Sequence, residues 1–298
     1  MVAVAVLALA IPIAVWVSDL IGDHQEEQGL HAQMAGSLRR VIFHSRILNA
    51  DKVFLIYMPP GYDDPNNAGV RYPALYLLHG CPGQARDWVV KGKAHVTLEK
   101  MILAHAVEPM IMVFPDLEGP RGQFDCNGGM DRPDGSWSVE QYVLEDVVNR
   151  VDTMYRTKAD GEHRAIAGVS MGGFAAMNLT ARHPEVFSVA CSMSGYYRAG
   201  DFAPIARHVL GSRKDLWRAN SPQDTIANVR SRAALHVLLI CGSQDEFLRQ
   251  NRAFAAQLKG LDVDSELKVS PGAHSFAFWS ARLKDCLLFA DRRFRAPS

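Results

Sequence analysis

The feature that most constrains this chain is the segment 165–175, which reads AIAGVSMGGFA. A short apolar run ends in the residues GVSMGG, and a helix-forming stretch follows at once. This is the G-x-S-x-G pattern between a strand and a helix, in which the serine sits on a tight, strained turn. Glycines flank the serine because side chains there would clash, and Gly173 allows the helix to pack close to the strand. The segment therefore predicts Ser170 as a nucleophile at the carboxyl end of a strand.

Short apolar runs alternate with helical patterns over most of the remaining chain. Strands are predicted at 74–78, 110–114, 187–193, 234–241 and 265–269, and two β-rich segments precede them at 41–48 and 53–58. Helices are predicted at 96–106, 138–155, from the end of the serine segment to 182, and at 250–258 and 277–294. Ser138 and Gln141 predict a capping box for the second of these helices, and 196–230 is expected to form a lid-like excursion. The alternation predicts an α/β fold with a mostly parallel central sheet and helices on both faces.

The composition excludes several classes of function. The chain has 298 residues, 48% hydrophobic and 21% charged, which is enough apolar material for a large core. Its 32 basic and 32 acidic residues balance, so no nucleic-acid partner is indicated. Five scattered cysteines include no C-x-x-C pair, which indicates neither a metal site nor a dense disulfide framework. One disulfide stays open, buried free thiols are expected for Cys191 and Cys241, and no cofactor is implied.

The N-terminal segment is almost wholly apolar, and residues 1–18 carry no charged side chain. Three interpretations of this segment stay open: a membrane anchor, an atypical signal peptide, and the end of a longer membrane region. A buried core helix is the purely structural alternative. We expect a membrane anchor or signal-like segment over 1–22, a polar linker over 23–40 and a catalytic domain over 41–298. That domain is then expected outside the cytoplasm, either membrane-anchored or secreted.

A serine hydroxyl needs a base to take its proton, and the base needs a third group to orient it. The strand predicted at 234–241 opens into GSQDE, and the last strand is followed by PGAHS. We choose Asp245 over Glu246 because neighbouring side chains of an extended segment point in opposite directions. His274, like Asp245, follows the carboxyl end of a strand, where ligands bind in parallel sheets. The chain order predicts Ser170, Asp245 and His274 as a catalytic triad.

The other candidate histidines fit this role less well. His236 lies within an apolar strand, His183 lies at a helix end, and His163 precedes the strand that leads to the serine. His79 is at the right end of its strand but comes before the serine in the chain. Only His274 combines the right end of the sheet with the expected order.

A tetrahedral intermediate needs hydrogen-bond donors for its oxyanion. We expect these donors to be the backbone N–H of Met171, directly after the nucleophile, and that of Cys81, in HGCPG after the strand at 74–78. The Cys81 thiol is a weaker alternative nucleophile, because no base is indicated near it. Trp88, Asp116 and Trp279 are expected to contact substrate, with ordinary packing or a solvated loop charge as the alternative for each.

Several sequence blocks resemble a known family. They are FLIYMPPGYD, RYPALYLLHGCPGQARDW, RAIAGVSMGGFAAM, CGSQDEFLRQN and PGAHSFAFW, and the resemblance covers about residues 40–294. They are similar to the Putative esterase family of α/β-hydrolases, which includes S-formylglutathione hydrolases (esterase D), feruloyl and acetyl-xylan esterases, and antigen 85 mycolyltransferases. The resemblance implies an α/β-hydrolase fold, a triad of Ser170, Asp245 and His274, and oxyanion donors at Cys81 and Met171.

The residues and the resemblance together predict a serine esterase that works through an acyl-enzyme. The expected substrate is a small-molecule, glycan or lipid ester, and membrane association is expected only through residues 1–22. One alternative is an acyltransferase of the mycolyltransferase type, in which a sugar or glycerol hydroxyl takes the place of water. An alternative of another class is an inactive hydrolase fold that serves as a binding module. A peptidase is less favoured, because no additional substrate domain is visible.

Overall fold

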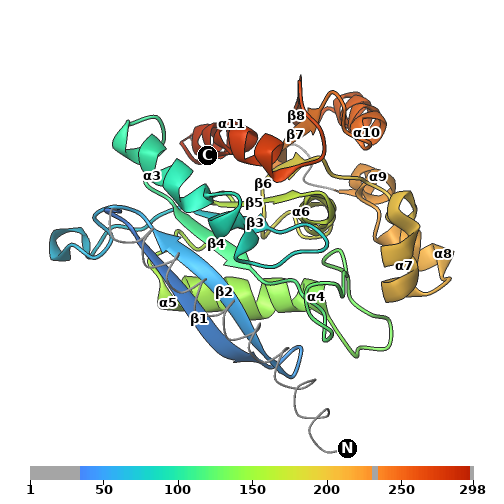
Figure 1. Cartoon of the computed structure of the whole chain (residues 1–298), viewed down its shortest axis with the longest axis horizontal. Helices are drawn as coiled ribbons and strands as arrows, with labels where there is room; N and C mark the ends of the chain where they lie inside the picture. Colours follow the sequence, from blue (N-terminus) through green and yellow to red (C-terminus); the bar gives the residue numbers. More distant parts are fainter. Residues whose placement is uncertain (1–33, 230–233, 296–298) are drawn as a thin grey trace, which may run out of the picture.

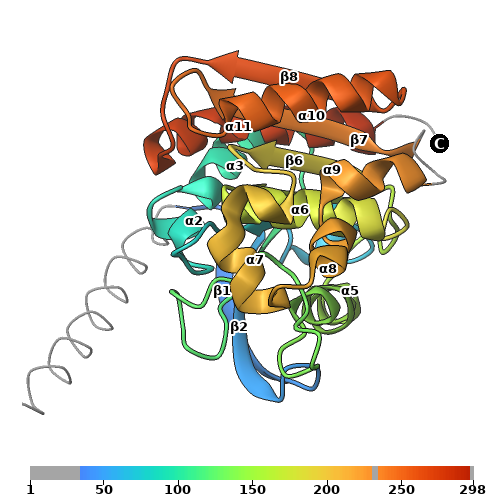
Figure 2. The same ribbon diagram turned by 90° about the vertical axis from the view of Figure 1, so that its right-hand side faces the viewer.

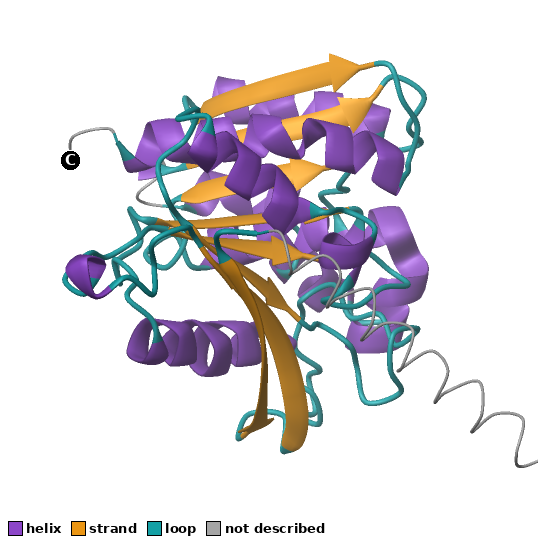
Figure 3. Cartoon of the chain, turned by 60° about the vertical axis from the view of Figure 1, so that its left-hand side comes forward, coloured by secondary structure: helices purple, strands orange, loops and turns teal. Residues whose placement is uncertain are grey.

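The computed structural model describes residues 34–229 and 234–295 of the chain. An eight-stranded sheet runs through this part in the order β1-β2-β4-β3-β5-β6-β7-β8. The strands are β1 (Ser37–Ser45), β2 (Ala50–Met58), β3 (Ala74–Leu78), β4 (Ile111–Pro115), β5 (Arg164–Val169), β6 (Val189–Met193), β7 (His236–Gly242) and β8 (Asp264–Ser270). β3 to β8 are parallel to one another, whereas β2 pairs antiparallel with both β1 and β4. Figure 3 shows β1 and β2 as a long, curved pair at one end of the twisted sheet.

Helices cover both faces of this sheet. The α-helices are α2 (Asp87–Val90), α3 (Ala94–Leu103), α4 (Val139–Gln141), α5 (Asn149–Met154), α6 (Met171–Arg182), α7 (Ala203–Leu210), α8 (Lys214–Ala219), α9 (Pro222–Thr225), α10 (Leu248–Gly260) and α11 (Phe276–Phe294). Short 3-10 helices are η1 (Pro65–Asn67), η3 (Ala199–Phe202) and η4 (Ile226–Asn228), and η2 (Tyr142–Val148) is a π-helix. In Figure 1, α3 and α11 lie on one face and α5 and α6 on the other.

The sheet separates two large apolar clusters, and β3 shows why. All five of its residues are buried, and alternate side chains enter opposite clusters because successive side chains of a strand point to opposite faces. Tyr76 packs in the cluster that includes α5, α6 and α10, whereas Leu75 and Leu77 pack in the cluster that includes α3 and α11. The predicted α/β-hydrolase fold, with its mostly parallel sheet covered on both faces, is confirmed.

A third apolar cluster lies beyond the sheet, against the start of α6. It joins Met171 and Phe174 to Tyr196 and to Val209 and Leu210 of α7. Figure 2 shows α7, α8 and α9 grouped together on the side of the molecule that carries α6. These short helices occupy the segment between β6 and β7 in which the sequence predicted a lid-like excursion.

Two local differences from the sequence-based expectations have simple causes. β1 begins at Ser37, inside the segment expected to be a linker, because pairing with β2 extends along the whole of both strands. The predicted capping box is wrong: Ser138 stands at the N-cap but its side chain makes no capping hydrogen bond. The N–H of Glu140 donates instead to Asp131 Oδ1 at 2.7 Å, and the predicted single helix is divided into α4, η2 and α5.

The N-terminal segment expected to meet a membrane, 1–22, lies outside the described residues. Across 34–229 and 234–295, no helix has the length and apolar character needed to cross a bilayer. Over the same residues, no group of three histidine, cysteine, aspartate or glutamate side chains is arranged to hold a metal ion.

Candidate active site

Ser170 occupies a strained turn between β5 and α6. Its φ of 54° and ψ of −119° are disfavoured for any residue other than glycine. The Ser170 N–H donates to the Met193 carbonyl at 2.9 Å, and its carbonyl accepts from the Phe174 N–H at 3.0 Å. Ser170 is partly exposed, although β5 is buried along its whole length and α6 is buried up to its last residue. The turn therefore keeps the serine accessible at the end of an otherwise buried strand–helix unit.

The two flanking glycines are required by close backbone approaches. A Cβ on Gly168 would collide with the carbonyl of Gly172, and a Cβ on Gly172 would lie 2.5 Å from the His79 carbonyl oxygen. The N-terminus of α6 thus packs directly on the end of β3. A Cβ on Gly80 would lie 3.5 Å from Ser170 Cβ, which is van der Waals contact. The loop after β3 therefore runs beside the serine.

Asp245 and His274 form a close pair. His274 Nδ1 lies 3.2 Å from Asp245 Oδ1 and 3.1 Å from Oδ2, and the Asp245 side chain is fully buried. Burial opposes ionisation of Asp245, but hydrogen bonds from His274, from the Phe247 N–H and from the Ser194 hydroxyl lower its pKa overall. Glu246 is exposed, so Asp245 is the acid that meets the histidine, as the alternation of side chains predicted.

Backbone hydrogen bonds connect the loops at the carboxyl ends of four neighbouring strands. Ser170, after β5, bonds to the last residue of β6, and the Ser194 N–H after β6 donates to Ile240 of β7 at 2.7 Å. The Gln244 N–H, after β7, donates to the Gly272 carbonyl, after β8, at 2.9 Å. Within the described residues no hydrogen bond joins Ser170 Oγ to His274, a contact that in free hydrolases is often long and tightens with substrate. The three residues of the predicted triad thus follow three of these four adjoining strands, β5, β7 and β8.

The structure places Trp88 and Trp279 inside the protein. Trp88 is fully buried and donates its indole N–H to the Leu78 carbonyl at 2.8 Å, so it presents no surface to a substrate. Trp279 is 6% exposed, and its ring meets the His274 imidazole edge to face with centroids 4.9 Å apart. Its indole N–H donates to Ser194 Oγ at 2.9 Å. Trp88 is therefore a core residue, and Trp279 contacts the site through the histidine.

Asp116 is also held by contacts inside the protein. Its side chain is mostly buried, with Lys52 Nζ 3.1 Å from Oδ2 and His79 Nε2 3.7 Å from Oδ1. Burial opposes its ionisation, but the charge of Lys52 and the hydrogen bond from the Glu118 N–H lower the pKa of Asp116 below its usual value. The carboxylate that the sequence offered for substrate contact is thus engaged by a buried lysine.

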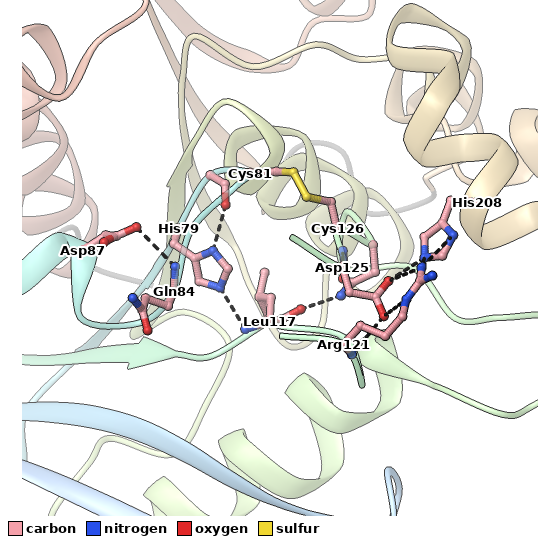
Figure 4. Close-up of a disulfide and its surroundings, with 12 residues drawn as sticks. His79, Cys81, Gln84, Asp87, Leu117, Arg121, Asp125, Cys126 and His208 are labelled. Carbon is pink, nitrogen blue, oxygen red and sulfur yellow. Dashed lines mark hydrogen bonds and ion pairs between the residues drawn. A yellow bond between two sulfur atoms is a disulfide. The ribbon is translucent and has the colours of Figure 1, made fainter. Parts of the chain in front are cut away.

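The loop with Cys81 is held by a disulfide and a histidine, shown in Figure 4. Cys81 is bonded to Cys126, 45 residues further on, a pairing that the sequence left open. His79 Nδ1 lies 2.8 Å from the Gly80 carbonyl, so it donates there, and His79 Nε2 accepts from the Leu117 N–H at 3.0 Å. Both bonds are satisfied together only by the neutral Nδ1–H tautomer. His79 therefore braces this loop against the segment after β4. Cys191 and Cys241 are buried free thiols, as expected.

A charged cluster lies on the far side of the disulfide, and sequence reasoning missed it. Asp125, next to Cys126, is buried and accepts from Arg121, Arg132 and His208 at 2.5–3.5 Å. These three basic side chains also line an open hollow of about 620 Å³ between the 116–135 loop and α7. The cluster joins residues up to 87 positions apart, and no local pattern in the sequence marks such a contact.

The fold and this site define an α/β-hydrolase. A family model described as Putative esterase matches residues 45–290, so the chain belongs to that family. An endo-1,4-beta-xylanase/feruloyl esterase of Xylanibacter ruminicola is 27% identical over 252 residues, covering 82% of this chain and 30% of that protein. The chain spans between 30% and 56% of the length of three curated relatives that it matches.

Solved structures show the same fold. A ferulic acid esterase superposes with a TM-score of 0.76 at 24% identity, covering 87% of this chain and 98% of that one. An S-formylglutathione hydrolase from Agrobacterium tumefaciens superposes with a TM-score of 0.72 at 20% identity, covering 88% and 96% respectively. At these identities the likeness concerns the fold.

Proposed function

We propose that this chain hydrolyses carboxylic esters through an acyl-enzyme formed on Ser170. The observation that carries the proposal is the buried Asp245 carboxylate, bound to Nδ1 of His274 at the same end of the sheet as the strained serine turn. With Nδ1–H held by the carboxylate, His274 Nε2 is left as the basic nitrogen.

The steps follow from these roles. Ser170 Oγ attacks the ester carbonyl carbon while its proton passes to His274 Nε2, giving a tetrahedral oxyanion. The intermediate collapses, His274 returns the proton to the departing alcohol, and the acyl group stays on Ser170. Water then attacks the acyl-enzyme with His274 again as base, which releases the acid and restores the serine. Asp245 stabilises the imidazolium in both half-reactions.

We assign the oxyanion hole to the backbone N–H groups of Met171 and Cys81. Met171 begins α6, where N–H groups lack intrahelical partners, and the Cys81 loop runs beside Ser170. Neither N–H donates to another group within the described residues. The Cys81 sulfur is engaged in the disulfide, which leaves Ser170 as the nucleophile and Cys81 with a main-chain role.

For the substrate, we propose esters with a polar alcohol part. The hollow lined by Arg121, Arg132 and His208 lies across the disulfide from the Cys81 loop, where an extended alcohol group could follow. The Xylanibacter relative carries feruloyl esterase in its name, which supports hydroxycinnamate esters of sugars as the first substrates to test. A disulfide in the site also supports action outside the cytoplasm, where disulfides persist.

The experiment compares the wild type with Ser170→Ala on p-nitrophenyl acetate, p-nitrophenyl butyrate and methyl ferulate, together with labelling by a fluorophosphonate probe. We expect the variant to keep the fold but to lose ester turnover and probe labelling, both of which the wild type should show. Equal turnover by the variant would refute the serine mechanism. An unlabelled, inactive wild type would favour the binding-module alternative. Addition of glycerol or glucose separates hydrolysis from acyl transfer, because a transferase forms the new ester in place of free acid.

A further inference from the structure

A tryptophan–serine pair lies behind the Asp245–His274 contact. Trp279, in the first turn of α11, meets the imidazole of His274 edge to face, with the two ring planes at 88°. Its indole Nε1 lies 2.9 Å from Oγ of Ser194, the fully buried residue that follows β6. Ser194 also lies near Asp245, and its hydroxyl contributes to lowering the pKa of that carboxyl. One tryptophan thus contacts the histidine directly and the aspartate through a serine.

The chemistry of the donors sets the direction of these hydrogen bonds. An indole N–H can only donate, so Ser194 Oγ accepts from Trp279 and must direct its own proton elsewhere. Two groups next to Ser194 could receive it, the Asp245 carboxylate and the Cys241 sulfur. Burial raises the pKa of Cys241 to about 12, so this group is a neutral thiol and a weak acceptor. The ionised carboxylate is the stronger acceptor, and the Ser194 proton therefore points to Asp245.

We propose that Trp279 and Ser194 are positioning residues that hold Asp245 and His274 in line for proton transfer. The proposal rests on the catalytic roles given above to these two residues. The fully buried Asp245 carboxylate accepts hydrogen bonds from the Phe247 N–H and from His274, and the Ser194 hydroxyl next to it is held in turn by the Trp279 indole.

The backbone at Ser194 supports this role. Ser194 has a φ of 54°, in the left-handed region that side-chain-bearing residues seldom adopt, and its N–H is held by the Ile240 carbonyl. Strained backbone at a buried serine persists only where the surroundings determine it, and such positions cluster at functional sites. A glycine would adopt this φ without strain, so the hydroxyl is the property that a serine adds here.

Three single variants distinguish the effect of losing the hydroxyl or the indole N–H from a general weakening of the fold. Trp279→Phe keeps an aromatic ring against His274 but removes the N–H, whereas Ser194→Ala and Ser194→Gly remove the hydroxyl. Ser194→Gly also relieves the positive φ, so it tests the hydroxyl in a fold that is not weakened by strain. We expect the two Ser194 variants to lower kcat by about 10- to 100-fold, the effect of losing a hydroxyl that faces a charged group, and Trp279→Phe to lower it by about 3- to 10-fold, the effect of losing one neutral hydrogen bond. KM should stay within about twofold of the wild type.

Trp217→Phe is the matched control. Trp217 is 7% exposed and donates its indole N–H to the Gly211 carbonyl at 3.0 Å, so the substitution removes a comparable bond in α8. We expect its kcat to match the wild type. A loss in this control as large as that in Trp279→Phe would overturn the proposal, since the effect would then belong to any buried tryptophan.

The double variant Trp279→Phe/Ser194→Ala tests the connection itself. Because the indole N–H acts on Asp245 only through Ser194, we expect the double variant to be no slower than the slower single variant. Multiplied losses would overturn the connection, as would a single variant with wild-type kcat. Ser170→Ala, assayed in parallel, separates the two levels: if it is inactive while the Trp279 and Ser194 variants match the wild type, only this inference fails. If Ser170→Ala retains turnover, the catalytic mechanism itself fails.

Discussion

The disulfide between Cys81 and Cys126 provides the most demanding test of the proposed site. It closes a loop with a sequence separation of 45 residues. In the chain-entropy model, a cross-link over a loop of that length stabilises the folded state by about 4 kcal/mol at 25 °C. For a chain of this size, that corresponds to a melting temperature lower by about 8–16 °C when the cross-link is removed. We expect a loss of this size in the double variant Cys81→Ala/Cys126→Ala.

The effect on catalysis should be smaller than the loss of an oxyanion donor. Removing one such donor typically lowers kcat by about 100- to 1,000-fold. Reduction leaves the Cys81 N–H in place, and His79 still bonds to Leu117 while the Gly83 N–H still donates to Gln123. We therefore expect reduction to displace the loop only partly, with a fall in kcat of about 10-fold and little change in KM.

The assay measures thermal unfolding and ester turnover before and after reduction, with the thiol count followed by mass spectrometry. The double variant is the control, because reductant should change neither its stability nor its turnover. Wild-type enzyme that is shown to be fully reduced, yet keeps its melting temperature and its kcat, would refute the reasoning. Such a result would mean that hydrogen bonds alone hold the Cys81 loop.

Three further predictions concern charge, substrate and packing. Burial and the nearby Glu140 charge raise the pKa of Asp131 to about 6; the folded state then holds a proton that the unfolded state releases from about pH 4, so this group lowers stability as pH rises from about 4 to 6. We expect Asp131→Asn to remove this pH dependence, so that the free energy of unfolding in urea, relative to the wild type, is about 1 kcal/mol more favourable at pH 7 than at pH 4.5 after allowance for solvent exposure. A variant with the pH dependence of the wild type would contradict this. Arg132→Gln should raise KM about 5-fold for esters with an anionic alcohol part and leave neutral esters unchanged, the effect of one partly exposed ion pair; equal changes for both kinds of ester would count against the hollow as a substrate site. Gly172→Ala should lower stability in urea by about 1–3 kcal/mol and reduce fluorophosphonate labelling, because its Cβ would meet the His79 carbonyl; Gly260→Ala, where the Cβ would meet open space, is the control.

Local patterns in the sequence were sufficient to predict much of the fold and the position of the candidate site. Runs such as ALYLL at β3 are buried on both faces, and the glycines around Ser170 are required by backbone contacts that any such turn makes. The choice of Asp245 over Glu246 followed from the alternation of side chains, and the structure has Asp245 against His274. The burial of β3, the glycines of the turn and the direction of the Asp245 side chain each depend on residues that are neighbours in the chain, so a local pattern can indicate them.

The remaining features depend on contacts between distant loops. Nothing near Cys81 indicates Cys126 as its partner, and the Asp125 cluster takes His208 from α7. The capping box failed for the same reason, since Asp131 from another turn replaced Ser138 as the acceptor. Spacing along the chain carries no information on such pairings, because they are set by loop conformation.

Trp279 shows how this limit affects the reading of function. An aromatic residue five positions after the candidate base was expected to contact substrate, and its position near the site was correct. Only the partner of its indole N–H distinguishes a residue that lines a pocket from one that supports the base. That partner, Ser194, lies 85 residues away and follows a different strand. The strand ends bring the candidate catalytic residues to one end of the sheet, but the buried hydrogen bonds between their loops distinguish side chains that are open to a substrate from those that hold their neighbours in position.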